Sequence, residues 1–323
     1  MIISPHQLDR AVAALRDGQL VAFPTETVYG LGADAANETA VRRIFAAKGR
    51  PADHPLIVHL PDIAALDDWA RNIPPAAWQL AERFWPGPLT MILPKAAHVP
   101  DVVTGGQQSI GLRIPDHPVA RALLHAFDGG IAAPSANRFG RISPTLAEHV
   151  QSELGDAVAL IVDGGPCRVG LESSIVDLTG EQPALLRPGH ISASQLAEVL
   201  GIAVAQPQRS TTRAPGTLAS HYAPLTRTSI VESDALLPAI DALLRQELRV
   251  AVLARQPAAI DDPRIFWQPA ADDPEAYAHD LYAHLRQLDA LQYDRILVEA
   301  VPEDETWLAV RDRLRRAAYT APE

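Results

Sequence analysis

The sequence predicts an α/β protein with two domains: a larger one built on a mixed, twisted sheet with helices, and a smaller C-terminal Rossmann-like α/β domain. Three observations predict this. Short apolar or β-branched runs alternate with helical patterns up to residue 205, a connector rich in Pro, Ser and Thr spans 206–227, and strand and helix patterns alternate again over 228–323. With 323 residues, 47% of them hydrophobic, the chain can bury two cores.

The elements follow from local periodicity and end signals. In the first domain, 1–205, we predict strands at 20–23, 56–60, 89–93, 110–114, 131–133, 159–163 and 174–178. Its predicted helices are 38–47, 76–84, 118–126, 146–154 and 193–200, the last with Ser192 as N-cap. In the second domain, 228–323, strands at 229–231, 249–254 and 295–300 alternate with helices near 235–246, 274–291 and 305–318. This alternation favours a small parallel sheet.

Composition excludes several classes of protein. The single cysteine, Cys167, rules out an intramolecular disulfide and a thiolate-rich zinc site, and the eleven histidines form no H-E-x-x-H motif. No apolar run approaches the length of a membrane span, and the first residues carry acids within a helical period, unlike a cleavable export signal. We therefore expect a cytoplasmic protein.

The charge distribution argues against a general nucleic-acid binder. The net charge is −11, divided into −6 for residues 1–205, +3 for 206–227 and −8 for 228–323. Nonspecific binding needs Lys and Arg to neutralise phosphates, which these acidic blocks do not provide. The cationic connector carries Arg213, His221 and Tyr222. It is either a plain linker or a lid that closes over a ligand.

Lys48 and Arg50 form a basic pair between a predicted helix and a predicted strand. A lysine point charge beside an arginine fork suits nucleotide phosphates, although two such residues are often solvated surface. Ser135 and Asn137 follow the predicted strand 131–133, and Ser143 lies farther along. Neutral donors of this kind can stabilise oxygens that gain charge, or they can simply form turns.

A hydroxyl-rich segment follows the first predicted strand: Thr25 and Thr27 precede Gly30 and Gly32. We predict a strand-end loop that a ligand can approach closely, with an ordinary turn as the alternative. It is not a Walker A loop, because the G-x-x-x-x-G-K-[ST] spacing occurs nowhere in the chain.

Ser109 and Arg113 lie four residues apart on one predicted strand, so their side chains share a face of the sheet. An arginine there needs an anionic partner, which is either a substrate carboxylate or a structural acid. His54 and His59 lie nearby in sequence, and neutral histidine can donate or accept, or be a satisfied core residue.

Glycine-rich chain precedes Ser173, and Arg187 is placed at a strand end. The glycines Gly164, Gly165 and Gly170 suit an anion-binding nest, but they suit a hairpin connection equally well. None of these segments alone decides the function.

In order along the chain, these segments resemble the YrdC/Sua5 family of threonylcarbamoyl-AMP synthases. The resemblance covers FPTETVYGLGADA from Phe23, AAKGRPADHPLIVH from Ala46, FWPGPLTMIL from Phe84, IGLRIPDHP from Ile110, APSANRFGRISPT from Ala133, DGG from Asp163, GLESSIVD from Gly170 and LLRPG from Leu185. The HYAP stretch from His221 and the second domain are similar to the longer, Sua5-type members. The resemblance implies a YrdC-like fold for the first domain and a Sua5-type second domain.

The resemblance implies a nucleotidyltransferase that joins L-threonine, bicarbonate or CO2, and ATP into threonylcarbamoyl-AMP with release of pyrophosphate, with Mg²⁺ accompanying ATP. The product would serve the formation of N6-threonylcarbamoyladenosine in tRNA. Downstream threonylcarbamoyl-transferase proteins would act on the tRNA, so no stable nucleic-acid binding and no membrane contact are expected of this chain.

The resemblance also implies residue roles. The threonine pocket would be lined by Thr27, His59, Arg113, Ala133 and Ser173. ATP would be held by Arg50, His54, Ser109, Ser135, Ser143, Arg187 and Tyr222. The catalytic set would be Lys48, Arg50, Ser135 and Asn137. His54 departs from the small polar residue that the family's pattern has there.

The role of the second domain stays open, and two other function classes remain beside this one. In the second domain, Asp312 stands where the family's pattern has Asn, so the domain is either a scaffold for the connector or a regulatory or partner-docking unit. A carbamoyl-transfer maturation module has a related catalytic fold, but this chain lacks the cysteine-rich zinc and acylphosphatase-like segments of that larger protein. A pure RNA-binding module conflicts with the acidic charge.

Overall fold

The computed structural model describes residues 1–207, 210–218 and 221–319 and divides them into two compact units. The first unit comprises Met1–Phe139 and Ser143–Thr217. The second comprises Gly140–Ile142 and the chain from Leu218 onward. The division therefore falls inside the predicted connector. Three residues of the predicted first domain, 140–142, belong to the second unit.

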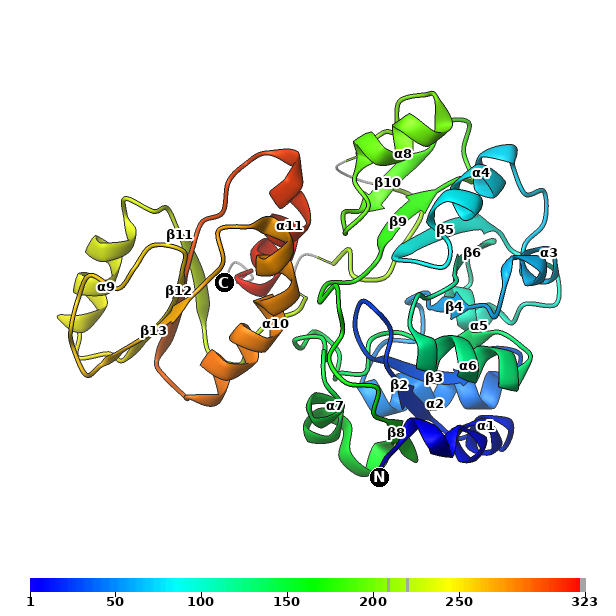
Figure 1. Cartoon of the computed structure of the whole chain (residues 1–323), viewed down its shortest axis with the longest axis horizontal. Coiled ribbons are helices and arrows are strands. Elements are labelled where there is room, and N and C mark those ends of the chain that lie inside the picture. Colours follow the sequence, from blue (N-terminus) through cyan, green and yellow to red (C-terminus); the bar gives the residue numbers. More distant parts are fainter. Residues whose placement is uncertain (208–209, 219–220, 320–323) are drawn as a thin grey trace. The chain divides into compact units, whose positions relative to one another are not determined.

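The first unit is built on a mixed sheet of ten strands in the order β1-β8-β2-β3-β7-β4-β6-β5-β9-β10 (Figure 1). The strands are β1 (Ile2–Ile3), β2 (Val21–Phe23), β3 (Gly30–Asp34), β4 (Ile57–His59), β5 (Leu89–Pro94), β6 (Ser109–Arg113), β7 (Ile131–Ala132), β8 (Leu160–Val162), β9 (Ser174–Asp177) and β10 (Ala184–Arg187). All seven predicted strands are confirmed. Both parallel and antiparallel neighbours occur, as predicted for a mixed sheet.

One prediction in this region was wrong: Gly30 and Gly32 lie in strand β3 and not in a loop. A Cβ at residue 32 would come within 2.8 Å of a Phe23 ring carbon and 3.1 Å of the Val21 carbonyl oxygen. Glycine is therefore needed at position 32 because the neighbouring strand β2 packs closely against it. In the sequence alone, a glycine needed for close packing cannot be told from a glycine in a turn.

Some helices of the first unit begin or end with a recognisable cap. They are α1 (Leu8–Arg16), α2 (Glu38–Lys48), α3 (Leu66–Trp69), α4 (Pro75–Phe84), α5 (Asp101–Thr104), α6 (Pro118–Phe127), α7 (Ala147–Leu154) and α8 (Ala193–Leu200). Asn37 caps α2 by accepting from the Ala40 N–H, and Gly49 ends it at φ 64°. Ser192 and Gln195 form a capping box on α8, which confirms the predicted N-cap.

The two faces of this sheet are covered differently. On one face Leu56, Val58 and Leu112 join a large core with helices α2, α4 and α8. On the other, Phe23 and Ile131 pack with α1 and α6 over one end of the sheet only. The remainder of that second face is left to polar side chains and a small apolar cluster.

The second unit contains a parallel sheet of four strands in the order β11-β14-β12-β13. The strands are β11 (Thr228–Val231), β12 (Val250–Ala254), β13 (Ile265–Pro269) and β14 (Arg295–Glu299). The helices are α9 (Leu236–Leu244), α10 (Pro274–Ala290) and α11 (Leu308–Ala317), with α9 on one side of the sheet and α10 and α11 on the other (Figure 1). The predicted Rossmann-like arrangement is confirmed. Strand β13 was missed because it is only half-buried and shows no apolar alternation.

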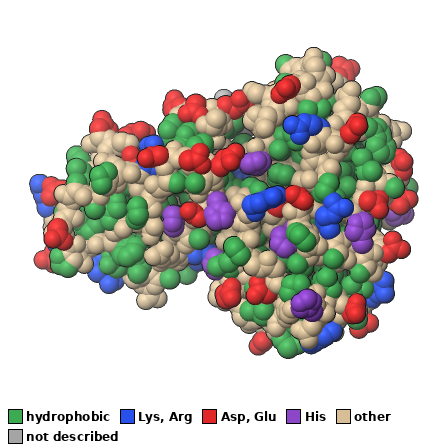
Figure 2. All heavy atoms as spheres, viewed as in Figure 1, with side chains coloured by type: hydrophobic (Ala, Val, Ile, Leu, Met, Phe, Trp, Pro, Cys, Tyr) green, Lys and Arg blue, Asp and Glu red, His purple; other side chains and the backbone are tan. Residues whose placement is uncertain are grey.

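Acidic side chains are scattered over the visible surface, in keeping with the net charge of −11 (Figure 2). Within the described residues, no helix combines the length and the apolarity needed to cross a membrane.

Candidate functional site

Strand register places several of the predicted binding residues on one face of the first sheet. His59 of β4 is the direct partner of Arg113 of β6, and it is also paired with Ile131, two residues before Ala133. Ser109 lies on the same strand as Arg113, four residues before it. Because directly paired residues and residues two apart share a face, these side chains all project from the face that α1 and α6 only partly cover.

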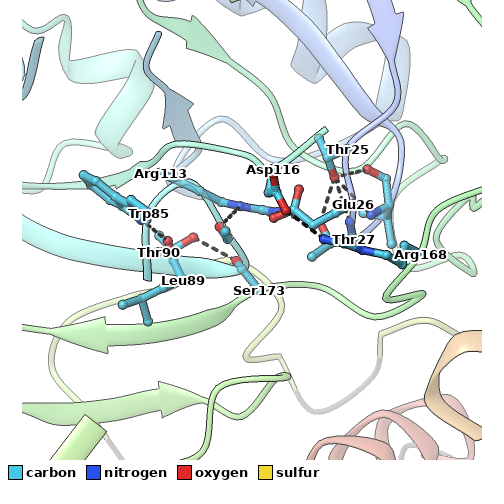
Figure 3. Close-up of polar contacts among 12 residues, drawn as sticks. Thr25, Glu26, Thr27, Trp85, Leu89, Thr90, Arg113, Asp116, Arg168 and Ser173 are labelled. Carbon is cyan, nitrogen blue, oxygen red and sulfur yellow. Dashed lines mark hydrogen bonds and ion pairs between the residues drawn. The ribbon is translucent and has the colours of Figure 1, made fainter. Parts of the chain in front are cut away.

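The opposite end of the sheet contributes to the same face. Thr90 of β5 pairs with Ile175 of β9, and Arg187 of β10 also pairs with Ile175. Ser173 lies two residues before Ile175, and its hydroxyl is 2.8 Å from the Thr90 hydroxyl (Figure 3). Arg187 donates to the Ser173 carbonyl from Nε at 3.0 Å and from Nη2 at 2.8 Å. Ser173 and Arg187, which the resemblance divides between threonine and ATP, are therefore neighbours.

The Arg113 guanidinium is held on three sides. Its Nε donates to the Gly87 carbonyl at 3.1 Å, and its Nη1 donates to the Thr27 hydroxyl at 2.9 Å. Its Nη2 lies 2.6 Å from a carboxylate oxygen of Glu26, in an ion pair whose side chains are 5% and 1% exposed (Figure 3). Of the two partners considered from the sequence, the structure contains the structural acid. Sequence reasoning missed Glu26, although it stands directly before Thr27.

The hydroxyls beside Arg113 form a directed chain. Thr25 donates its single hydroxyl proton to the Val28 carbonyl at 2.6 Å, so the 2.8 Å contact between the two threonine hydroxyls has Thr27 as donor. Thr27 in turn accepts from Arg113. The predicted turn is thus held in one orientation, with the Thr27 hydroxyl bonded to the guanidinium and the Thr25 hydroxyl bonded to Thr27.

His59 is a buried neutral imidazole. Burial, and then the charge of Arg113, lower its pKa from 6.5 to about 3. The ring of Phe23 meets it edge-on at 6.0 Å between centroids. It can therefore donate or accept a hydrogen bond in this pocket without adding a charge.

Lys48 is buried and faces the backbone of the loop that carries Ser135 and Asn137. Its Nζ donates to the carbonyl oxygens of both residues, at 2.5 Å each. The Phe139 N–H donates to the Lys48 carbonyl oxygen at 2.8 Å. Burial, and then the nearby Arg50, lower its pKa well below the ordinary value. The structure therefore brings three of the four predicted catalytic residues into direct contact.

Arg50 and His54 lie beside this loop. The Arg50 guanidinium donates to the Pro55 carbonyl at 2.8 Å and lies 5.9 Å from the centre of the Phe139 ring. The same ring meets His54 edge-on at 5.3 Å. Burial, and then Arg50, lower the pKa of His54, so this position adds no positive charge at neutral pH.

Ser143 is fully buried and donates to a Glu172 carboxylate oxygen at 2.5 Å. Glu172 is itself buried and directly precedes Ser173, so this bond links Ser143 to the Ser173–Arg187 group. Sequence reasoning did not select Glu172, because in the GLESS motif it stands next to a serine that already had a role.

The first part of the connector covers part of the same face. Ala214 packs with Ile57, Ile92 and Ile175, and Pro215 accepts a bond of 3.0 Å from Arg187 Nη1. Arg213 anchors this stretch by donating to the backbone oxygens of Asp53, at 2.8 Å, and Gly105, at 2.7 Å. Residues 210–217 therefore belong structurally to the first unit.

Tyr222 belongs to the second unit. It is 1% exposed, has φ 61°, and lies under Arg313, whose guanidinium carbon is 5.2 Å from the ring centre. Its ring also lies 5.7 Å from that of Tyr282. Its role at ATP stays a prediction.

The described residues offer neither a protein metal centre nor an activated thiol. No three His, Cys, Asp or Glu side chains in that part of the chain are arranged to hold a metal ion. Cys167 is 1% exposed, and burial raises the pKa of its thiol. The same face gathers buried cations, hydroxyls and a neutral imidazole, which are groups that can bind and orient a ligand and stabilise charge. Fold and site together define an α/β protein with a buried polar binding face on its mixed sheet.

Comparison with known proteins gives the family. A family model named for Sua5, YciO and YrdC, described as telomere recombination, matches residues 13–189, and a model described as the C-terminal domain of threonylcarbamoyl-AMP synthase matches 191–319. The chain belongs to this Sua5/YrdC family and is an enzyme of the threonylcarbamoyl-AMP synthase type.

Two relatives and one solved structure span nearly the whole chain. Threonylcarbamoyl-AMP synthase of Pyrococcus abyssi is 43% identical over 95% of this chain and 93% of its own length. That of Bacillus subtilis is 42% identical over 97% and 93%. A crystal structure of P. abyssi Sua5 complexed with L-threonine has a TM-score of 0.91 at 41% identity, covering 98% of this chain and 97% of that one. The resemblance predicted from the motifs is confirmed.

Proposed function

We propose that this site condenses L-threonine, CO2 or bicarbonate, and ATP into threonylcarbamoyl-AMP and pyrophosphate, with both substrates held on the face defined by His59 and Arg113. The observation that carries the proposal is the guanidinium fixed by Glu26, Thr27 and Gly87. A solved relative complexed with L-threonine supports the choice of amino acid.

For threonine, we assign the pocket to Thr27, His59, Arg113, Ala133 and Ser173. Each terminal nitrogen of a guanidinium carries two N–H bonds, so Nη1 and Nη2 of Arg113 keep donors for a substrate carboxylate after bonding Thr27 and Glu26. His59 is neutral and buried and supplies a hydrogen-bonding group for the substrate's polar atoms.

For ATP, we assign Arg50, His54, Ser109, Ser135, Ser143, Arg187 and Tyr222, with Lys48 and Asn137 completing the loop that faces the phosphates. The described residues contain cations and hydroxyls there and no cluster of acids for a metal ion. Mg²⁺ would therefore enter as part of the substrate Mg·ATP, neutralising phosphate charge.

The reaction requires no nucleophilic side chain. The threonine amine attacks CO2 and loses a proton to give a carbamate, whose oxygen attacks the α-phosphorus while the bond to pyrophosphate breaks. The protein orients the two substrates and stabilises the charge that develops on the leaving group through Lys48, Arg50 and Ser135. Burial matters because both the carbamate and the adenylate are labile in water.

The test is threonine-dependent release of pyrophosphate by Lys48→Ala and Arg50→Ala variants. We expect each to lose about two orders of magnitude in turnover, as is typical when one group that stabilises developing charge is removed. Arg42→Ala is the matched control, because Arg42 lies on the same helix α2 with 63% of its side chain exposed. Undiminished turnover in either variant would remove that residue from the mechanism.

The substrate assignment is tested separately with ATP, labelled bicarbonate and a panel of amino acids. A threonine-selective adenylate is the expected product. Salt-sensitive RNA binding without turnover would instead favour an RNA-binding module, and transfer of a carbamoyl group from another donor would favour the maturation module. A cytoplasmic location and hand-over of the product to threonylcarbamoyl-transferase proteins remain part of the proposal, as does the absence of stable nucleic-acid binding, which the net charge of −11 supports.

A further inference from the structure

A short loop from the predicted first domain, residues 140–142, is bound within the second unit. In this loop, Arg141 forms an isolated parallel β-bridge with Ala223. The Ala223 N–H donates to the Gly140 carbonyl at 2.9 Å, and Arg141 Nη1 donates to the Ala223 carbonyl at 3.2 Å. Arg286 of helix α10 donates to the Ile142 carbonyl.

Asp289, near the end of α10, joins this loop to the connector. Its Oδ2 accepts from Arg141 Nη2 at 3.0 Å and from the Leu225 N–H at 2.9 Å, while its Oδ1 accepts from the Thr226 N–H at 2.8 Å. The Asp289 and Arg141 side chains are 10% and 22% exposed. Burial raises the pKa of Asp289, but the bonds from Leu225, Thr226 and Arg141 outweigh burial and lower it overall, so the carboxylate is charged at neutral pH.

The two segments that Asp289 joins lead directly to proposed ATP residues. The loop 140–142 lies between Asn137 and Ser143, and Ser143 is the next residue in the chain. Leu225 follows Tyr222 by three residues. A single partly buried carboxylate with three donors therefore restrains both stretches of backbone at once.

We infer that Asp289 is a positioning residue for ATP binding, and that the second unit serves the reaction by fixing the loop 140–142 and the connector through it. The inference rests on the proposed function for the identity of the ligand. It assigns a task to a unit for which the sequence left two readings open. Threonine binding does not depend on Asp289, because Arg113, Thr27 and Glu26 are held entirely by contacts of the first unit.

The experiment compares Asp289→Ala, Asp289→Asn, Arg141→Ala and the Asp289→Ala/Arg141→Ala double variant with the wild-type full chain. Calorimetry with ATP and, separately, with threonine measures the two dissociation constants without requiring turnover. We expect the Kd for ATP to rise about tenfold in Asp289→Ala and in Arg141→Ala, and the Kd for threonine to stay within about twofold. The loss of ATP-binding free energy in the double variant should be no greater than the sum of the losses in these two single variants. Asp289→Asn should fall between wild type and Asp289→Ala, because one acceptor oxygen remains.

Asp262→Ala is the matched control. Asp262 makes a two-point contact with Arg264 in the same unit, at 2.7 and 3.0 Å, but bonds neither the loop nor the connector. An unchanged Kd for ATP in Asp289→Ala and Arg141→Ala would overturn the inference, as would equal weakening of ATP and threonine, or equal effects in Asp262→Ala. If Asp289→Ala does not fold, Arg141→Ala alone decides. Wild-type protein that binds ATP but releases no threonine-dependent pyrophosphate would refute the proposed function and leave the binding comparison valid.

Discussion

Replacing Glu26 by Gln tests the ion pair that fixes Arg113. The substitution keeps the shape of the side chain and an oxygen that can accept from Arg113 Nη2, but it removes the negative charge. Arg113 would then be a buried cation, with its side chain 5% exposed, and none of its partners (the Gly87 carbonyl, the Thr27 hydroxyl and the retained oxygen) would carry a negative charge.

The expected loss follows from burial. Removing one partner of a buried ion pair costs about 3–5 kcal/mol, because the other charge is left uncompensated. The two hydrogen bonds that Arg113 keeps, and the acceptor retained by Gln, place Glu26→Gln at about 3 kcal/mol, the lower end of that range. Out of a total stability of about 5–15 kcal/mol, this change is large enough to measure easily.

Urea unfolding of the wild type, Glu26→Gln and a control variant measures the free energy of unfolding. The control is Asp116→Asn, which breaks the pair between Asp116 and Arg168 at 2.7 Å, whose side chains are 43% and 72% exposed (Figure 3). Exposed pairs contribute about 0–1 kcal/mol, so this variant should be nearly neutral. If Glu26→Gln costs no more than Asp116→Asn, the view of Arg113 as a buried, charge-compensated clamp is wrong.

Four further outcomes are expected. Folding lowers the pKa of His59 from 6.5 to about 3, so the free energy of unfolding is highest above pH 6.5 and falls as the pH is lowered toward 3. In His59→Asn, the free energy of unfolding should depend less on pH over this range. Cys167, 1% exposed with a raised thiol pKa, should react with iodoacetamide only after unfolding, as followed by mass spectrometry. Gly105 has φ 60°, and a Cβ there would lie 2.2 Å from the Asp53 carbonyl oxygen, so Gly105→Ala should lower the melting temperature by several degrees. Because burial lowers the pKa of Lys48 and a polyanion favours its charged form, the affinity for ATP should fall as the pH is raised into the alkaline range, as measured by calorimetry at a series of pH values.

The fold was largely predictable because its elements carry strong local signals. Helix α8 begins at a capping box, and strands such as β5 and β8 consist mainly of apolar residues. Strands β1 and β13 were missed for physical reasons: β1 has two residues, and β13 is half-buried along its length. Strand β3 was obscured by glycines whose purpose, close packing against Phe23, depends on a neighbour that local sequence does not identify.

The residues of the candidate site could be selected from the sequence, but their ion-pair and hydrogen-bond partners could not. Motif resemblance selected Arg113, Lys48 and Ser143, and register places Arg113 and His59 side by side. It did not reveal that Glu26 neutralises Arg113 or that Glu172 accepts from Ser143, because both acids come from distant segments. Such partners depend on tertiary contacts across more than twenty-five residues, which periodicity and spacing do not encode.

The partners of the two buried cations match the charges of the two proposed substrates. Arg113 is compensated by a carboxylate, so its pocket has little net charge and suits an amino acid, whose ammonium and carboxylate cancel. Lys48 is bonded to two carbonyl oxygens, which stabilise an ammonium without neutralising it, so a positive charge placed there remains available to a polyanion. If Glu26 instead faced Lys48, a triphosphate would meet a neutral loop and threonine an uncompensated guanidinium, and the pocket would favour a simple carboxylate over a zwitterion. The placement of one acid therefore separates the amino-acid end of the site from its phosphate end.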